Sequence, residues 1–197
     1  MTARPEARNS RWEATHQRIY DVALELFQRD GFENVSVGQI AKGAKISVPT
    51  FYAHYNSKEH LVMRPATVEE ISALMATQPA SVPITDRLRR AIPIWFSDWT
   101  PEFREAQLVR WRVIASTPSL RTRAAEFERA SAEMVAKVLP AEPGATLSPA
   151  ELLIINTQLA AYTFALLAWA DSNGERKLEE LIEESFDSLH GTPRPES

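Results

Sequence analysis

The sequence of 197 residues contains no cysteine. Disulfide bonds, thiolate metal sites and a cysteine nucleophile are therefore excluded. The chain also lacks a long apolar run: the longest, residues 159–170, is interrupted by Thr163 and is shorter than the roughly 20 residues that a helix needs to cross a bilayer. The first residues are polar and lack the apolar segment of a secretion signal. We therefore expect a cytoplasmic protein that does not enter a membrane.

Residue groupings typical of catalysis or metal binding are equally scarce. The chain has four histidines, and the grouping of His54, Glu59 and His60 matches neither the His-Glu-x-x-His nor the His-x-x-Glu-His spacing of zinc enzymes. No Gly-x-Ser-x-Gly sequence marks a nucleophilic serine, although counting residues does not exclude a Ser-His-Asp site. We therefore expect no metal site, no cofactor and no enzymatic activity.

Charge is distributed unevenly along the chain. The net charge is −4, but residues 1–60 carry eight Lys and Arg against seven Asp and Glu, whereas residues 61–197 carry fourteen against nineteen. Four of the cations, Arg4, Arg8, Arg11 and Arg18, lie within the first twenty residues. A weakly cationic N-terminal part and an acidic remainder favour contact with phosphate through one end of the molecule only.

The N-terminal part shows helical patterns with short connections. Residues 1–12 are expected to form a flexible arm. An apolar stripe predicts a first helix from Glu13 to a stop at Gly31, a residue type suited to the left-handed position that follows a helix. Ser36 and Gln39 form a capping box that opens a second helix.

A third, very short helix follows, with Ser47 as its expected N-cap and Pro49 in its first turn. A further capping signal at residues 56–59 opens a fourth helix that is expected to continue to Met75. The second and third helices, joined by a turn of about three residues, form a helix-turn-helix pattern. Short helices of this kind bind DNA in some proteins and serve only as packing elements in others.

The remainder of the chain predicts five more helices. Pro93 is expected to kink or split the first of them, and Ser148, Pro149 and Glu151 together are a strong helix start. The expected helices cover residues 84–99, 101–116, 119–139 and 149–171, followed by a final helix that ends near residue 189. The fold class is therefore all-α with about nine helices, in a helix-turn-helix domain at residues 13–60 and a larger helical domain at 61–190, followed by a disordered tail at 191–197.

Two stretches of the N-terminal domain carry a family resemblance. Residues 35–41 read Val-Ser-Val-Gly-Gln-Ile-Ala, and residues 44–61 read Ala-Lys-Ile-Ser-Val-Pro-Thr-Phe-Tyr-Ala-His-Tyr-Asn-Ser-Lys-Glu-His-Leu. Over roughly residues 13–61 the chain resembles the DNA-binding head of the TetR family of transcriptional regulators. The resemblance implies that the third helix enters the major groove of operator DNA, where base edges are distinguishable.

The resemblance also assigns candidate contacts. Thr50 and Tyr52 have polar groups of suitable reach for base edges, Val48 and Pro49 suit a thymine methyl group, and Phe51 is expected in the core. The full set of candidate DNA-binding residues is Ser36, Val37, Ser47, Val48, Pro49, Thr50, Tyr52, His54 and Lys58.

Tyr52, His54 and Lys58 are the candidates for phosphate contacts. The helix macrodipole is a separate reason to expect a phosphate at Lys58. A cation in the first turn of a helix opposes the macrodipole, and a bound phosphate would offset this unfavourable interaction. The alternative is a solvated Lys58 paired with a nearby carboxylate.

Two residues depart from the family pattern. Lys45 stands where the family usually has glycine in the turn, so we expect the backbone there to be strained or differently wound. Val48 stands where a basic residue is common, so one contact usual in the family is not expected.

The last two expected helices suit a dimer interface. The helix at 149–171 is apolar nearly all round, so both of its faces must be covered, and the final helix carries one apolar stripe. In the resembled family these helices form a four-helix bundle across a twofold axis, so we expect a homodimer with recognition helices about 34–36 Å apart. The alternative is a central core helix in a monomer.

Aromatic residues between the head and these helices suggest a ligand site. Residues 110–123 resemble a TetR subgroup with an acyl-CoA-like ligand-binding domain, which includes mycofactocin-associated regulators. That resemblance implies that the aromatic side chains bind an acyl chain. It also implies that phosphates are bound by Arg110, Arg112, Arg121 or Arg123. The alternatives are an aromatic or apolar ligand, or a plain core with surface ion pairs. The candidate ligand-binding residues are Trp95, Trp99, Phe103, Trp111, Phe127 and Arg110.

The sequence therefore predicts a DNA-binding transcriptional regulator, a repressor that a small molecule releases from its operator. The competing interpretation is an all-helical protein that binds or converts a small molecule without binding DNA. Retardation of duplex DNA separates the two.

Overall fold

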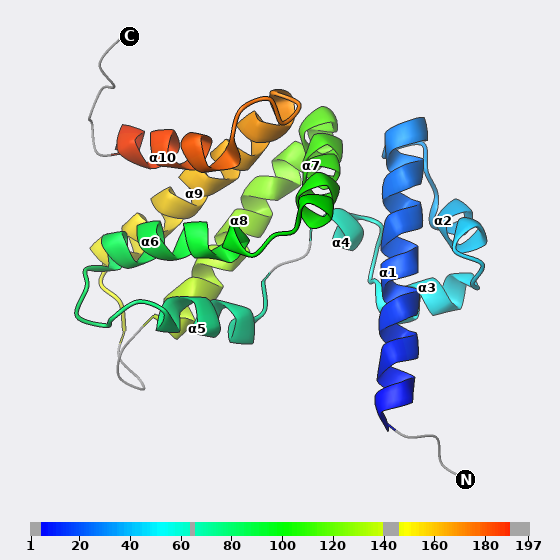
Figure 1. The fold of residues 1–197 in the computed structure, drawn as a ribbon, viewed down its shortest axis with the longest axis horizontal. Helices are drawn as coiled ribbons and strands as arrows, with labels where there is room; N and C mark the ends of the chain where they lie inside the picture. The colour runs from blue at the N-terminus through cyan, green and yellow to red at the C-terminus, as the bar shows by residue number, and fades with distance from the viewer. Residues whose placement is uncertain (1–4, 64–65, 140–145, 190–197) are drawn as a thin grey trace. The chain divides into compact units, whose positions relative to one another are not determined.

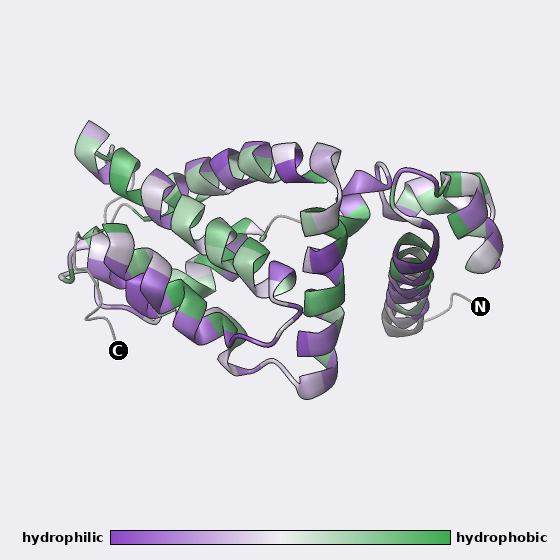
Figure 2. Cartoon of the chain, turned by 90° about the horizontal axis from the view of Figure 1, so that it is seen from above, coloured by the Kyte–Doolittle hydropathy of each residue, from purple (hydrophilic) through white to green (hydrophobic). Residues whose placement is uncertain are grey.

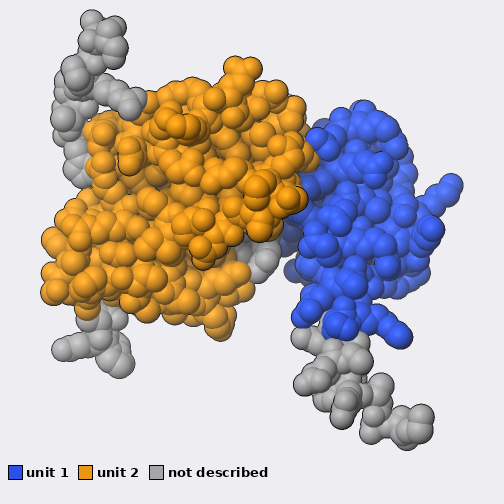
Figure 3. Space-filling model, in the orientation of Figure 1, with its two compact units in different colours: residues 1–64 blue, residues 65–197 orange. Residues whose placement is uncertain are grey.

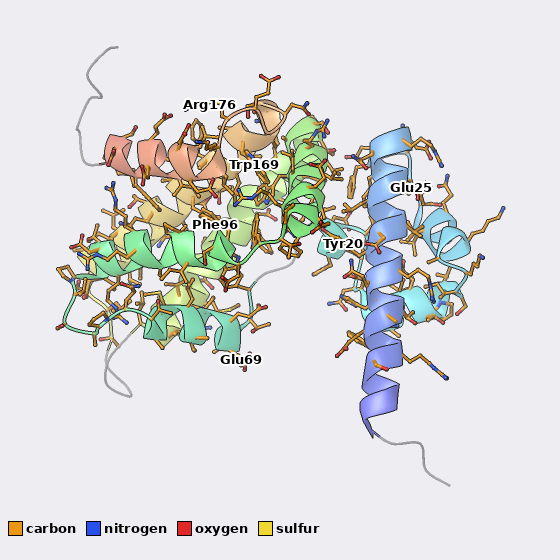
Figure 4. The ribbon with its side chains drawn as sticks, viewed as in Figure 1. Tyr20, Glu25, Glu69, Phe96, Trp169 and Arg176 are labelled. Atoms are coloured by element: carbon orange, nitrogen blue, oxygen red, sulfur yellow. The ribbon has the colours of Figure 1, made fainter. Side chains whose placement is uncertain are left out.

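The computed structural model of the chain describes residues 5–63, 66–139 and 146–189, and these ranges contain ten α-helices and no strand. The all-α class is confirmed, with ten helices against about nine expected. The helices belong to two compact units, Met1–Arg64 and Pro65–Ser197, which Figure 3 shows in different colours. The expected tail at 191–197 lies outside the described residues.

Unit 1 contains α1 (Pro5–Asp30), α2 (Val37–Gly43), α3 (Val48–His54) and α4 (Glu59–Val62), as Figure 1 shows. The prediction of a flexible arm is wrong for residues 5–12, which belong to α1. Proline has no backbone N–H, so Pro5 is well suited to the first helical turn, where that group would have no partner.

The core of unit 1 joins its first three helices. Ile19 of α1, Ile40 of α2 and Phe51 of α3 are completely buried, which confirms the expectation for Phe51. Burial of a side chain of this size stabilises a fold by about 1.5–3 kcal/mol. Phe32, just after α1, turns its ring back toward Phe27, with 4.8 Å between the ring centroids.

The turn between α2 and α3 contains the backbone strain expected at Lys45, whose φ is 55°. A non-glycine residue in this left-handed region costs about 1–2 kcal/mol. Two hydrogen bonds hold the turn: Lys45 N donates to Lys42 O at 3.1 Å, and Ile46 N donates to Ala41 O at 3.0 Å. This is the Schellman pattern of helix termination, which satisfies the last carbonyls of α2.

The predicted continuous helix toward Met75 is wrong. α4 ends at Val62, and a separate helix, α5 (Val68–Ala76), begins in unit 2. Thr67 is its N-cap and forms a capping box with Glu70, in which Thr67 N donates to Glu70 Oε2 at 2.7 Å. The sequence held both signals, because Pro65 lacks a backbone N–H and residues 67–70 fit the capping-box pattern.

Unit 2 also contains α6 (Ile84–Ser97), α7 (Pro101–Ser116), α8 (Pro118–Val138), α9 (Pro149–Asp171) and α10 (Leu178–Leu189). Pro93 does not split α6, which is one helix. The predicted start of α9 is confirmed: Ser148 is the N-cap, with a full capping box to Glu151. Figure 2 shows polar and apolar residues interleaved along the helices, the pattern of elements that bury one face.

α9 is the central helix of unit 2 and contacts α6, α7, α8 and α10. By length and composition it is apolar enough to cross a membrane, but its inward side forms the core of this unit with residues such as Ile155, Ala165 and Trp169. Among the described residues none covers its outward side, where Leu153 is 64% and Phe164 67% exposed.

Candidate nucleic-acid interface

The short helix α3 presents a mixed apolar and polar surface. Phe51 anchors the helix in the core, while Val48 is 40% and Tyr52 52% exposed, and Pro49 beside them is exposed as well. Val48 and Tyr52 are four residues apart and therefore lie on the same face of the helix. The structure thus exposes three of the predicted contact residues together on a helix that the buried Phe51 anchors.

Ser47 and Thr50 bind each other at the start of α3. The Ser47 hydroxyl accepts a hydrogen bond from Thr50 N at 3.2 Å, and the two side-chain oxygens are 2.7 Å apart. Both oxygens therefore have a partner within the helix cap. Capping hydroxyls stabilise a helix by about 1 kcal/mol, so Ser47 has a structural role whether or not it touches DNA.

A surface groove of about 390 Å³ brings three more candidates together with Tyr52. We call it the head groove. Ser36 is held there by its capping box, in which Ser36 N donates to Gln39 Oε1 at 2.8 Å. The groove is lined by Glu33, Asn34, Val35, Ser36, Val37, Tyr52, Asn56, Ser57, Lys58 and Glu59.

Lys58 uses its ammonium group inside the unit. Lys58 Nζ donates to Phe32 O at 2.9 Å and to Val35 O at 3.2 Å, and it lies 4.3 Å from the centroid of the Phe32 ring. These two carbonyls explain a cation at the start of a helix without a phosphate or a carboxylate partner. Lys58 therefore braces the connection between α1 and α2, a role that sequence reasoning missed.

His54 lies in a stack of rings on the side of α1. Its ring centroid is 4.7 Å from that of Trp12 and 5.7 Å from that of His16, and the His16 ring stacks on Tyr55 at 4.2 Å. Burial lowers the pKa of His54, so the ring is neutral at pH 7. A phosphate contact by His54 would therefore be a hydrogen bond from a neutral ring. Trp12 was missed because its position was assigned to a flexible arm.

The candidate ligand residues of unit 2 are brought together only in part. Trp95, Trp99 and Trp111 pack against a core cluster formed by α6, α7, α9 and α10. Phe103 is 47% exposed and meets Trp99 edge-on, with 5.3 Å between the centroids. Phe127 lies on α8 and is not part of that cluster.

Arg110 is the arginine nearest to these aromatic residues. Its guanidinium lies 5.6 Å from the Trp111 ring centroid and donates to Gln107 Oε1 at 2.9 Å. Burial raises the pKa of Tyr162, an effect that Arg110 partly offsets. Arg121, by contrast, pairs with Asp171 at the surface, at 2.9 Å. Tyr162 was not among the predicted residues, and the helix pattern alone gave no sign of it.

Among the residues that the structure describes, no group of three His, Asp or Glu side chains is placed to hold a metal ion. One polar side chain is deeply buried: Gln158 of α9 is 1% exposed, and its Nε2 donates to Thr85 O at 3.0 Å.

Two family models match the chain. Bacterial regulatory proteins of the tetR family match residues 19–64, and the MftR C-terminal domain matches residues 82–192. The chain is similar to the protein of Mycobacterium tuberculosis named as the mycofactocin biosynthesis transcriptional regulator MftR, with 29% identity over 132 residues that cover 66% of either chain. It is also similar to the HTH-type transcriptional regulator TcmR of Streptomyces glaucescens, with 27% identity over 157 residues that cover 73% of this chain and 66% of TcmR.

The matched stretches thus span just under two thirds of either relative. Among solved structures, the chain resembles NalD of Pseudomonas aeruginosa, the secondary repressor of the MexAB-OprM multidrug efflux pump. The TM-score is 0.53 at 20% identity, and the match covers 91% of this chain and 95% of NalD. At this identity the likeness shows the fold.

Replacing Lys58 with methionine should destabilise unit 1. Methionine keeps an apolar stem but leaves the Phe32 and Val35 carbonyls without their charged donor, a loss of about 1–3 kcal/mol. Chemical denaturation, monitored by amide exchange in α1 and α2, measures this loss of stability. Lys42→Met removes the same charge from an exposed position of α2 and should change stability little. Equal stability of the two variants would contradict the bracing role.

Proposed function

The chain belongs to the TetR family of bacterial regulatory proteins, with a C-terminal domain of the MftR type, and we propose that it represses transcription by binding an operator as a homodimer that a small molecule releases. We place this activity in the cytoplasm. The observation that carries the proposal is the surface of α3, an anchored seven-residue helix that exposes Val48, Pro49 and Tyr52.

A helix in the major groove reads bases through a few outward side chains. Val48 and Pro49 offer apolar contact to a thymine methyl group, and the Tyr52 hydroxyl can reach a base edge or a phosphate oxygen. The head groove beside Tyr52 gives the sugar–phosphate backbone a place to pack. Ser36 and Val37 line that groove at the start of α2, as a positioning helix of the motif requires.

The homodimer is supported by the uncovered side of α9. Leu153 and Phe164 are large apolar residues exposed on this helix, and they are eleven residues apart, close to three full turns, so they share one face. A second copy that covers this face through α9 and α10 would bury both side chains. Such a dimer has two copies of α3, and we propose that they enter successive turns of the major groove.

The ligand is proposed to bind in unit 2, beside the tryptophans of α6 and α7. Trp95, Trp99 and Trp111 are only partly buried, so they offer apolar surface next to the Arg110 guanidinium. An apolar chain and an anionic group on one molecule fit this combination. An acyl-CoA has both, which makes it the first ligand to test, ahead of an uncharged aromatic compound.

Replacing Tyr52 with alanine should weaken binding to duplex DNA from the promoter region of the protein's own gene about tenfold or more, the usual loss for one specific contact. Tyr52→Phe keeps the edge-on contact with Phe51, at 5.4 Å between the ring centroids. It therefore isolates the contribution of the Tyr52 hydroxyl to DNA binding. Mobility shift against an unrelated duplex measures affinity and specificity. The control is Phe103→Ala, an exposed aromatic of unit 2. A wild-type protein that retards neither duplex would favour the competing interpretation, a ligand-binding protein without DNA.

Replacing Phe164 with glutamate should yield monomers. The side chain is exposed within one chain, so glutamate leaves the protomer fold intact, but in a dimer it would bury an unpaired charge. Sedimentation at micromolar concentration measures the mass of both forms. Phe103→Glu carries the same change on α7 and should remain dimeric. A wild-type protein that sediments as a monomer would contradict the dimer.

Long-chain acyl-CoA should lower the affinity for DNA about 5–150-fold if its coupling to DNA is about 1–3 kcal/mol. By reciprocity, operator DNA should weaken acyl-CoA binding by the same factor. Tryptophan fluorescence with and without operator measures both affinities, and free coenzyme A and the fatty acid serve as controls. Arg110→Gln should weaken acyl-CoA binding more than fatty-acid binding. Equal acyl-CoA affinity in both conditions would show that it is not the inducer.

A further inference from the structure

The N-terminal part of α1 lies outside the family match, which begins at residue 19. α1 itself begins at Pro5, so its first turns precede the matched residues. Trp12 is in this preceding segment and is 47% exposed. It is the only tryptophan of unit 1, because the other four are residues 95, 99, 111 and 169.

Trp12 presents one covered and one open face. The ring centroids of His16 and His54 lie 4.8 Å and 4.7 Å from that of Trp12, and both rings are stacked on it. The two imidazole centroids are only 5.7 Å apart. Rings on opposite faces of the indole would be almost twice as far apart, so both imidazoles cover the same face. The opposite face of Trp12 accounts for its exposure.

The stack fixes Trp12 at the border of the exposed surface of α3. His54 is the last residue of α3 and follows Thr50 by four residues, so the two share a side of the helix. Both are partly buried, whereas Val48, Pro49 and Tyr52 are exposed. Trp12 therefore lies beside the Thr50 and His54 side of α3, which borders the exposed side of that helix.

We propose that Trp12 is a further DNA-contacting residue, which packs its open face on the sugar–phosphate backbone beside the groove that α3 enters. This inference rests on the proposed function. An indole offers an apolar face for deoxyribose and an N–H donor for a phosphate oxygen. The preceding residue, Arg11, is exposed, and the first twenty residues hold four arginines against two glutamates. Both facts favour an anionic partner, such as the DNA backbone, over a basic protein surface.

His54 becomes a positioning residue for Trp12 in this arrangement. Its ring supports the indole from behind, and its Nδ1 is buried with no hydrogen-bond partner among the described residues. The His54 ring packs against Trp12 and His16, and these contacts link α1 to the end of α3.

The test compares Trp12→Ala and Trp12→Phe with the wild type, using the promoter duplex at several salt concentrations. Trp12→Ala should weaken binding roughly tenfold, as expected for loss of one aromatic contact to nucleic acid. The salt dependence should stay unchanged, because an uncharged contact releases no counterion. Trp12→Phe should keep most of the affinity. Val68→Ala, with the same 47% exposure in unit 2, should bind like the wild type.

A second measurement separates contact from bracing. The emission of Trp12 is the difference between the wild type and Trp12→Phe, because the four tryptophans of unit 2 are common to both. Acrylamide should quench this emission in the free protein, and saturating operator should protect it. A residue that only braced α3 would stay equally accessible when DNA is bound.

Protection of the Trp12 emission together with the loss in Trp12→Ala supports the proposal. Unchanged quenching in the saturated complex overturns it, even if Trp12→Ala loses affinity through a less stable unit 1. Wild-type-like binding of Trp12→Ala overturns it as well. Where Tyr52→Ala fails to bind and Trp12→Ala binds normally, only this inference fails; where the wild type binds no duplex, the proposed function fails with it.

Discussion

The anchoring of Phe51 is the interaction on which the DNA-binding surface depends. α3 has seven residues, and an isolated helix of that length is unstable in water because nucleation is unfavourable. Complete burial of Phe51 and the Ser47 cap hold the helix in place. The outward side chains therefore do not need to stabilise the helix. They can therefore vary to suit an operator while the inward residue remains an aromatic of fixed size.

Two cations of unit 1 bind backbone carbonyls of the same unit. Arg18 Nε donates to Ala44 O at 3.0 Å, and Lys58 donates to two further carbonyls. Each of these bonds closes a connection next to α2, so the charges stabilise the relative positions of α1, α2 and α3. The same charges contribute less to attraction of phosphate. An N-terminal part with little net charge then needs uncharged contacts as well, and an exposed indole is one of the few large groups that can supply them.

The sequence predicted local features well because their causes are local. Ser36, Ser47 and Ser148 are N-caps with partners three residues away, and the strain at Lys45 follows from one residue type in one turn. Features that join distant residues were not predictable in this way. The partners of Lys58 lie more than twenty residues earlier in the chain.

The stack of Trp12 on His54 was likewise not predictable from the sequence, because it depends on the angle at which α1 crosses α3. No periodicity in the sequence encodes that angle. The missed break after α4 is different, because Pro65 and the Thr67 capping box were readable in the sequence, yet the helix that starts at residues 56–59 was continued to Met75. For the ligand residues, hydrophobic periodicity identified the helices but did not separate core from binding site. Trp95, Trp99 and Trp111 satisfy both descriptions, since they pack on a core and keep part of their surface open.

At Lys45, whose backbone is left-handed, the stability of the turn and the surface charge favour different residues. Glycine would relieve the backbone, but it would also remove an exposed ammonium from the turn between the two helices of the motif. A chain with lysine there gives up folding free energy and gains long-range attraction for a polyanion. Selection at this position therefore acts through the balance between thermal stability and the rate of encounter with DNA, and that balance shifts with ionic strength. A host with a salt-rich interior would gain little from the lysine, and glycine would be the better residue.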